Sequence, residues 1–130
     1  MDNNINNEIY SFNNIEYKIS ISPQGDKISI IQLINVNNSS KYENEISLDQ
    51  LQQKDLRFNI IEDNDDLIQT IKENIKLNKL EVVEFENYCE MNLKVSNKEL
   101  KIQLSKIKED LAEYVKSQNR YIYILTQNLK

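Results

Sequence analysis

Apolar and polar residues alternate through most of residues 80–104, and the rest of the chain is arranged around this stretch. The apolar members of its two clearest runs are Cys89, Met91, Leu93, Val95, Leu100, Ile102 and Leu104. Successive side chains of a strand point to opposite faces, so each run buries one face and leaves the other in water. The polar residues 96–98 between the runs predict a turn. The stretch therefore predicts an antiparallel hairpin, with residues 80–86 as a third strand before it.

An earlier hairpin is predicted over residues 15–36. Ile15, Tyr17, Ile19 and Ile21 alternate with polar residues, and the apolar alternation returns from Ile28 onwards. Between the two runs, residues 22–26 contain a proline, which fixes one φ, and the only glycine, which adopts positive φ without strain. Residues 9–12 suggest a short strand before this hairpin, and residues 42–48 suggest another strand after it.

Two helices are predicted within an insertion of about residues 47–78. Ser47 followed by Gln50 matches the capping box, in which each side chain satisfies a free backbone amide of the other residue. The second helix, residues 65–77, has apolar residues at helical spacing, and Asp63 or Asn64 is its N-cap. Between the helices, residues 56–60 show a brief alternation that predicts extended chain.

The period changes after Leu104. Apolar and large side chains recur at alternating steps of four and three, which is a heptad seam and predicts a helix that begins a coiled coil. We expect this helix to form a homodimer interface through Ile107, Leu111, Tyr114, Gln118, Tyr121, Ile122, Leu125 and Leu129. On a single helix, such a stripe would leave apolar side chains exposed to water, and a partner helix would cover them.

The length and composition suit one small domain. The chain has 130 residues, of which 39% are hydrophobic. We divide it into a flexible tail (1–7), a β-rich head (8–104) and the C-terminal helix (105–130). A net charge of −5 does not favour binding to nucleic acid or to an anionic membrane. The single cysteine, Cys89, cannot form an internal disulfide, and the polar N-terminus is not a signal peptide. These features favour the cytoplasm.

The usual catalytic and cofactor-binding residues are missing from the sequence. The chain has no histidine, which excludes Ser-His and Cys-His nucleophiles and histidine-bearing zinc sites. One glycine is too few for a phosphate-binding loop. The acidic run 62–66 could suggest calcium, but Ile68 would stand where a calcium loop needs glycine. We therefore expect no catalytic, cofactor or metal site, and we interpret Cys89 as a core residue.

The order of elements resembles the globular heads of a scaffold superfamily that includes the centriolar cartwheel protein and the DNA end-joining scaffold proteins. The sequences ISLDQLQQ, IEDNDDLIQTIKENI, EMNLKV and KELKIQL carry the resemblance, which is closest to a head module frequent in ciliates and other protists. It implies a small antiparallel β-barrel or sandwich with a helical insertion, mounted on a coiled coil. It also implies a head–head contact at Tyr88, where the family favours phenylalanine in a longer, Asn-rich hairpin tip.

Two functional hypotheses follow. In the first, the chain is a non-catalytic scaffold that homodimerises through its C-terminal helix and presents its head to an unidentified protein, which the resemblance implies to be cytoskeletal, centriolar or ciliary. In the second, it is a monomeric adaptor for a protein or peptide, with the C-terminal helix packed back on the sheet. An enzyme would need carboxylates clustered in a cleft, and no spacing in the sequence indicates them.

Overall fold

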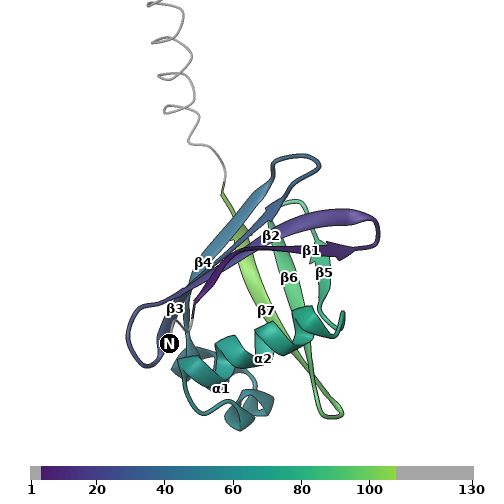
Figure 1. Ribbon diagram of the computed structural model, residues 1–130. Coiled ribbons are helices and arrows are strands. Elements are labelled where there is room, and N and C mark those ends of the chain that lie inside the picture. The colour runs from purple at the N-terminus through teal and green to yellow at the C-terminus, as the bar shows by residue number, and fades with distance from the viewer. Residues whose placement is uncertain (1–3, 108–130) are drawn as a thin grey trace, which may run out of the picture.

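The computed structural model of this chain describes residues 4–107. They form one seven-stranded antiparallel sheet in the order β1-β2-β3-β4-β7-β6-β5, curled into a half-barrel with the helices at its open side (Figure 1). The strands are β1 (Ile5–Phe12), β2 (Ile15–Pro23), β3 (Ile28–Asn35), β4 (Lys41–Ser47), β5 (Glu81–Glu84), β6 (Tyr88–Val95) and β7 (Lys98–Lys106). The helices are α1 (Leu48–Lys54), the 3-10 helix η1 (Leu56–Ile60) and α2 (Asn64–Lys76). The predicted mainly-β fold with a helical insertion is confirmed.

The first four strands form a continuous antiparallel meander. Asn13 and Asn14 both have positive φ, 52° and 65°, which gives the tight type I′ turn that joins β1 to β2. Gly25, at φ 98°, provides the left-handed conformation in the β2–β3 turn. The predicted hairpin over residues 15–36 is therefore confirmed, and its inward side chains at Ile19, Ile31 and Leu33 are fully buried.

The last three strands form a second meander, which contains the alternating stretch of residues 80–104. Met91 pairs with Ile102 across β6 and β7, and Val82 pairs with Met91 across β5 and β6. Leu93 and Ile102 are completely buried, as the alternation predicts.

The two meanders join through a short ladder between β4 and β7. Only Tyr42 with Lys106 and Glu43 with Ser105 are paired there. Beyond this ladder, the Asn44 side chain donates a 3.1 Å hydrogen bond to the carbonyl of Gln103.

The helices begin at the predicted caps. The Ser47 hydroxyl accepts from the Gln50 amide at 3.4 Å, and the Asp63 carboxylate accepts from the Asp66 amide at 2.8 Å. Leu67, Ile68 and Ile71 on α2 are buried against the sheet. The acidic run is thus the start of a helix, as expected from its capping residues.

The structure differs from the sequence-based expectations in three places. β1 begins at Ile5, inside the predicted tail, because Ile5 pairs with Ile21 and is buried. The residues expected to be extended at 56–60 form η1, because the Asp55 carboxylate caps the turn by accepting from the Arg57 amide at 3.0 Å. β7 continues to Lys106, two residues past the expected end of the head, because Ser105 and Lys106 pair with β4.

Seven of the predicted dimer-interface residues lie outside the described residues. They are Leu111, Tyr114, Gln118, Tyr121, Ile122, Leu125 and Leu129. None of the helices within residues 4–107 is both long enough and apolar enough to cross a membrane.

Candidate protein-interaction surface

The end of β7 is fixed between two connections at one end of the head. The Lys106 amide donates a 2.9 Å hydrogen bond to the carbonyl of Asn87, between β5 and β6. The Ile107 amide donates a 2.8 Å hydrogen bond to the carbonyl of Lys41, at the start of β4. Residue 107, the first position of the predicted heptad seam, therefore has a defined place on the head.

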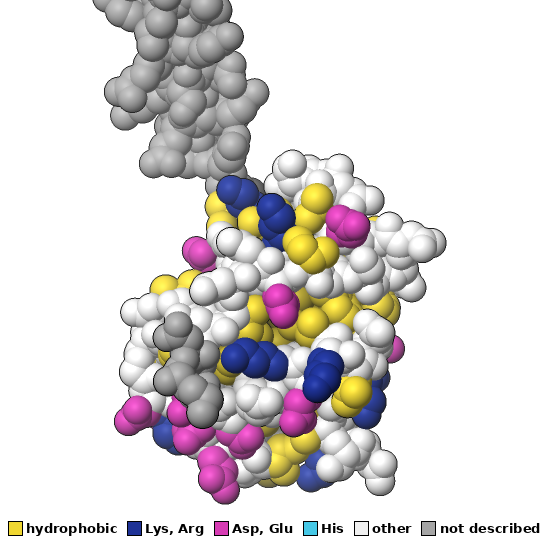
Figure 2. Space-filling view, viewed as in Figure 1, with side chains coloured by type: hydrophobic (Ala, Val, Ile, Leu, Met, Phe, Trp, Pro, Cys, Tyr) yellow, Lys and Arg dark blue, Asp and Glu magenta, His cyan; other side chains and the backbone are white. Residues whose placement is uncertain are grey.

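Exposed apolar side chains lie at this end of the head. Phe85 and Ile107 are each 42% exposed and Val36 is 40% exposed, although all three are large apolar residues. Figure 2 shows hydrophobic and basic side chains together where the chain leaves the head. Val36, Phe85, Tyr88 and Ile107 are termed the exit surface below. Apolar groups left in water in this way mark interaction sites more often than scattered single residues do.

An aromatic pair gives the exit surface a fixed shape. The rings of Phe85 and Tyr88 stack with their centroids 4.5 Å apart and an angle of 15° between the ring planes. The Phe85 amide donates a 2.8 Å hydrogen bond to the Tyr88 carbonyl, which closes the turn between β5 and β6. The two rings are therefore held together by the backbone as well as by their contact.

A polar cluster lies next to the exit surface, centred on the half-buried Glu84 that directly precedes Phe85. Its Oε2 accepts hydrogen bonds from the Tyr17 hydroxyl at 2.8 Å and from the Asn35 amide group at 2.9 Å. Its Oε1 accepts from the Tyr42 hydroxyl at 2.8 Å. Three donors from β2, β3 and β4 thus hold the end of β5, directly before Phe85.

Asn35 connects the Glu84 cluster to the loop that carries Val36. Its side-chain oxygen accepts from the amides of Asn37 at 2.9 Å and Asn38 at 3.3 Å. The Val36 amide in turn donates to the carbonyl of Glu16 at 2.9 Å. This loop is therefore fixed by buried groups on one side and by β2 on the other, which leaves the Val36 side chain exposed.

Three groups of this region, the Cys89 thiol and the Tyr17 and Tyr42 hydroxyls, have raised pKa values. The pKa of the Cys89 thiol is raised to about 12, chiefly by burial and to a smaller extent by the negative charge of Glu84. Burial, and then the hydrogen bonds to Glu84, raise the pKa of Tyr17 and of Tyr42 above their usual value. A buried, protonated thiol is a poor nucleophile. These side chains therefore act as a structural connection between the two meanders, and Cys89 is the core residue that its strand position predicts.

The sequence-based prediction at Tyr88 lies in this region, but Phe85 was missed. Tyr88 is the first residue of β6 and is half-buried, whereas Phe85 is the more exposed ring of the pair. Phe85 follows the apolar run of β5 and precedes Glu86 and Asn87, so a large apolar residue beside a polar turn was the available signal. Within residues 4–107, no group of three or more acidic, cysteine or histidine side chains could hold a metal ion.

Comparison with known proteins adds no functional information. No protein-family model matches the chain, and no curated protein matches it in sequence.

Proposed function

We propose that this chain is a non-catalytic structural module. In this proposal, the heptad segment that follows β7 forms a homodimer, and the dimer presents its heads to a protein partner. The resemblance to cartwheel and end-joining scaffold heads extends the proposal to a β-barrel-type head on a coiled coil, in a cytoskeletal, centriolar or ciliary assembly. The position of the helical insertion between two groups of strands supports this extension.

The main support for this proposal is the apolar exposure of the exit surface. Ile107 is both an exposed residue of this surface and the first position of the heptad seam. A second helix packed along the seam would remove Ile107 from water, and the neighbouring Phe85 and Val36 side chains would extend the covered area. Burial of apolar surface contributes about 25 cal/mol for each Å2 removed from water. The head therefore adds area to a seam that is itself rich in polar residues.

The test is the mass of the intact chain in solution, measured by sedimentation equilibrium over a range of concentrations. Tyr121 lies on the heptad seam and Tyr123 lies off it, so the two tyrosines provide matched variants. We expect the wild-type chain to dimerise and Tyr121→Ser to raise the dimer dissociation constant at least tenfold, which corresponds to about 1.4 kcal/mol. Tyr123→Ser should change it less than twofold. A wild-type monomer at several hundred micromolar would refute the proposal.

A monomeric adaptor remains the second candidate, because the exit surface could equally be covered by the same chain's C-terminal segment. The same two variants separate the candidates. In the adaptor, Tyr121→Ser would lower the melting temperature of a protein that is monomeric throughout. In the dimer, it would change the mass at a given concentration.

A further inference from the structure

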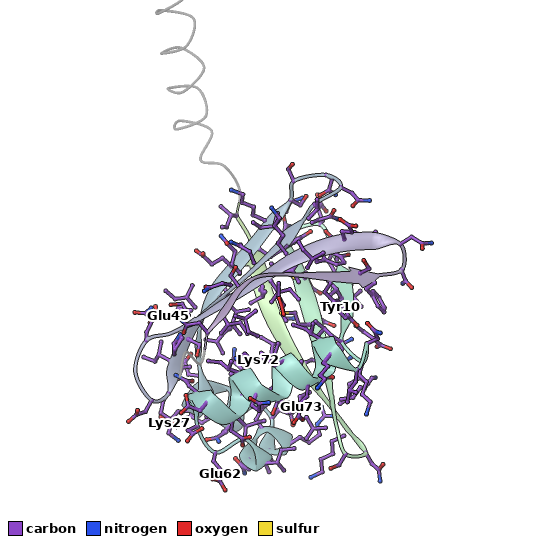
Figure 3. The ribbon with its side chains drawn as sticks, viewed as in Figure 1. Tyr10, Lys27, Glu45, Glu62, Lys72 and Glu73 are labelled. Atoms are coloured by element: carbon purple, nitrogen blue, oxygen red, sulfur yellow. The ribbon has the colours of Figure 1, made fainter. Side chains whose placement is uncertain are left out.

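A groove separates the edge strand β1 from helix α2, at a distance from the exit surface. It has a volume of about 520 Å3 and is lined by Asn4, Ile5, Asn6, Glu8, Lys72, Ile75 and Lys76. Figure 2 shows a hollow with hydrophobic side chains in it, bordered by basic side chains. In Figure 3, Lys72 lies on the side of α2 nearer to β1, and Glu73 lies on the other side.

One wall of the groove belongs to a strand with a free edge. β1 is the first strand in the sheet order and pairs only with β2. In a hairpin closed by a two-residue turn, the residues flanking the turn, here Phe12 and Ile15, exchange backbone hydrogen bonds. Alternation then directs the backbone groups of Tyr10 towards β2 and those of Ile9 and Ser11 away from it. Among residues 4–107, no strand pairs with this outer edge.

The other wall carries unpaired positive charge. Lys72 and Lys76 lie four residues apart on α2, which places them along one side of the helix. In the described part of the chain, neither of them has a carboxylate oxygen within 4.0 Å, whereas Lys27, Arg57 and Lys94 do. Glu8 is the one carboxylate among the lining side chains. The groove is thus locally basic on a chain whose net charge is −5.

We propose that this groove binds an extended peptide segment of a partner protein in which carboxylate and apolar side chains alternate. The segment adds to the free edge of β1 and extends past the groove, so its backbone hydrogen-bonds to Ile9 and Ser11, which continue β1 beyond the groove-lining Glu8. Its apolar side chains pack on the half-buried Ile75, and its carboxylates lie at Lys72 and Lys76. A helix could not use the strand edge, because its backbone groups are already paired within the helix.

Peptide binding at this groove does not depend on the proposed dimer, since the two sites lie towards different ends of β2. Ile5 of the groove pairs with Ile21, whereas Val36 of the exit surface hydrogen-bonds to Glu16. A failure of peptide binding would leave the mass measurements unchanged. A monomeric mass would likewise leave the groove proposal intact.

The probe is a fluorescein-labelled nonapeptide of alternating valine and glutamate, titrated with the full chain and followed by fluorescence anisotropy. We expect saturable binding that weakens with added salt and that falls at least tenfold for Lys72→Glu/Lys76→Glu. Lys98→Glu/Lys101→Glu makes the same change in net charge on exposed positions outside the groove, and it should reduce binding less than threefold.

The strand-addition geometry has its own test. A nonapeptide N-methylated at every second residue along one edge cannot form the strand ladder, and we expect it to bind at least tenfold more weakly. In amide NMR spectra, the valine–glutamate peptide should shift the signals of Ile9 and Ser11 more than those of Glu99 and Lys101.

Several outcomes would overturn the proposal. These are absence of saturable binding at millimolar peptide, equal losses in the two charge-reversal pairs, and equal binding of a valine–lysine peptide. If Lys72→Glu/Lys76→Glu changes the mass of the protein without peptide, the occupant of the groove is a second copy of the chain. If Tyr121→Ser alone shifts the Ile9 and Ser11 amides, the occupant is this chain's own C-terminal segment.

Discussion

The Tyr17 hydroxyl donates a 2.8 Å hydrogen bond to the Glu84 carboxylate, which lies 67 residues later in the chain. Tyr42 donates to the other oxygen of the same carboxylate at 2.8 Å. β2 and β4 belong to the first meander and β5 to the second, and the backbone ladder between the meanders is short. One carboxylate therefore joins the two halves of the sheet next to the exit surface.

The first prediction concerns the stability of this connection. Tyr17→Phe or Tyr42→Phe removes one hydroxyl donor and leaves the half-buried Glu84 carboxylate with one hydrogen-bond partner fewer. A hydrogen bond to a carboxylate is worth about 1.5–3 kcal/mol, so each variant should lower the free energy of unfolding by about that amount. Urea unfolding followed by circular dichroism measures it.

Tyr88→Phe is the matched control, because it removes a hydroxyl from a half-buried ring and retains the stack with Phe85. We expect this variant to unfold within about 0.5 kcal/mol of wild type. The two core variants should also be non-additive, since both donors serve the same acceptor. Equal, small effects for all three tyrosines would show that the Glu84 cluster contributes nothing measurable.

The second prediction concerns alkaline pH. The Cys89 thiol has an ordinary pKa of 9.0 and a folded pKa of about 12, raised chiefly by burial and then by the Glu84 charge. The unfolded chain therefore loses this proton at a lower pH than the folded protein does. Stability from this group is fully present below about pH 9 and is lost as the pH rises from 9 towards 12. Tyr17 and Tyr42 act in the same direction above pH 10, since burial raises both pKa values.

The measurement is the urea midpoint of wild type and of Cys89→Ala between pH 8 and pH 11. Both proteins should lose stability because of their tyrosines and their growing negative charge, but wild type should lose more. The thiol should also resist a thiol-specific reagent at pH 8 until urea unfolds the protein. Parallel midpoint curves, or fast reaction in the folded state, would contradict the assigned burial of Cys89.

Local patterns predicted the parts of the fold whose contacts are local. The β2–β3 and β6–β7 hairpins each join strands through a short turn, so alternation and turn chemistry determine them together. Helix α2 is predicted for the same reason, because Asp63 and the apolar residues that follow lie within one segment. In these elements, the residues that decide the structure are near one another in sequence.

Contacts between segments that are distant in the sequence could not be predicted from local patterns. Glu84 is one of 21 acidic residues, and nothing beside it in the sequence distinguishes it from a solvated carboxylate. Its function depends on Tyr17, Asn35 and Tyr42, which the closing of the sheet brings to it. Ile5 was assigned to a tail because polar residues surround it, and only pairing with Ile21 explains its burial.

The third prediction concerns Asn74, a polar residue buried on α2 for a reason that the sequence does not show. Its side-chain oxygen accepts from the Lys94 amide at 2.7 Å, and its side-chain nitrogen donates to the Lys94 carbonyl at 3.1 Å. Asn74→Ala should therefore leave two backbone groups of β6 without their partner. The expected cost is about 1–3 kcal/mol for each group, measured by urea unfolding.

Two variants make the Asn74 test specific. Asn74→Asp keeps an acceptor for the Lys94 amide but loses the donor, so it should retain hydrogen-exchange protection at that amide better than Asn74→Ala does. Glu73→Ala changes an exposed neighbour on the same helix and should shift stability by no more than about 0.5 kcal/mol. Unchanged exchange at Lys94 in Asn74→Ala would show that this hydrogen bond does not hold α2 to the sheet.

The fourth prediction separates an interaction surface from an incidental exposed side chain. Phe85 is 42% exposed on the exit surface, whereas Leu56 is 76% exposed on η1, away from the point where the chain leaves the head. Apolar area alone would therefore make Leu56 the more important residue for association. If the proposed dimer covers the exit surface, the order is reversed, because only Phe85 is removed from water on association.

Phe85→Ser should raise the dimer dissociation constant about tenfold, since truncating an aromatic residue at the centre of an interface costs more than about 1 kcal/mol. Leu56→Ser should leave it within about twofold, and sedimentation equilibrium of the full chain measures both. The melting temperature of each variant guards against a folding defect, which neither exposed side chain should cause. Equal effects of the two variants would mean that association follows exposed apolar area in general. A larger effect of Leu56→Ser would place the interface at the helical end of the head, and the heptad segment would then need a different position in the assembly.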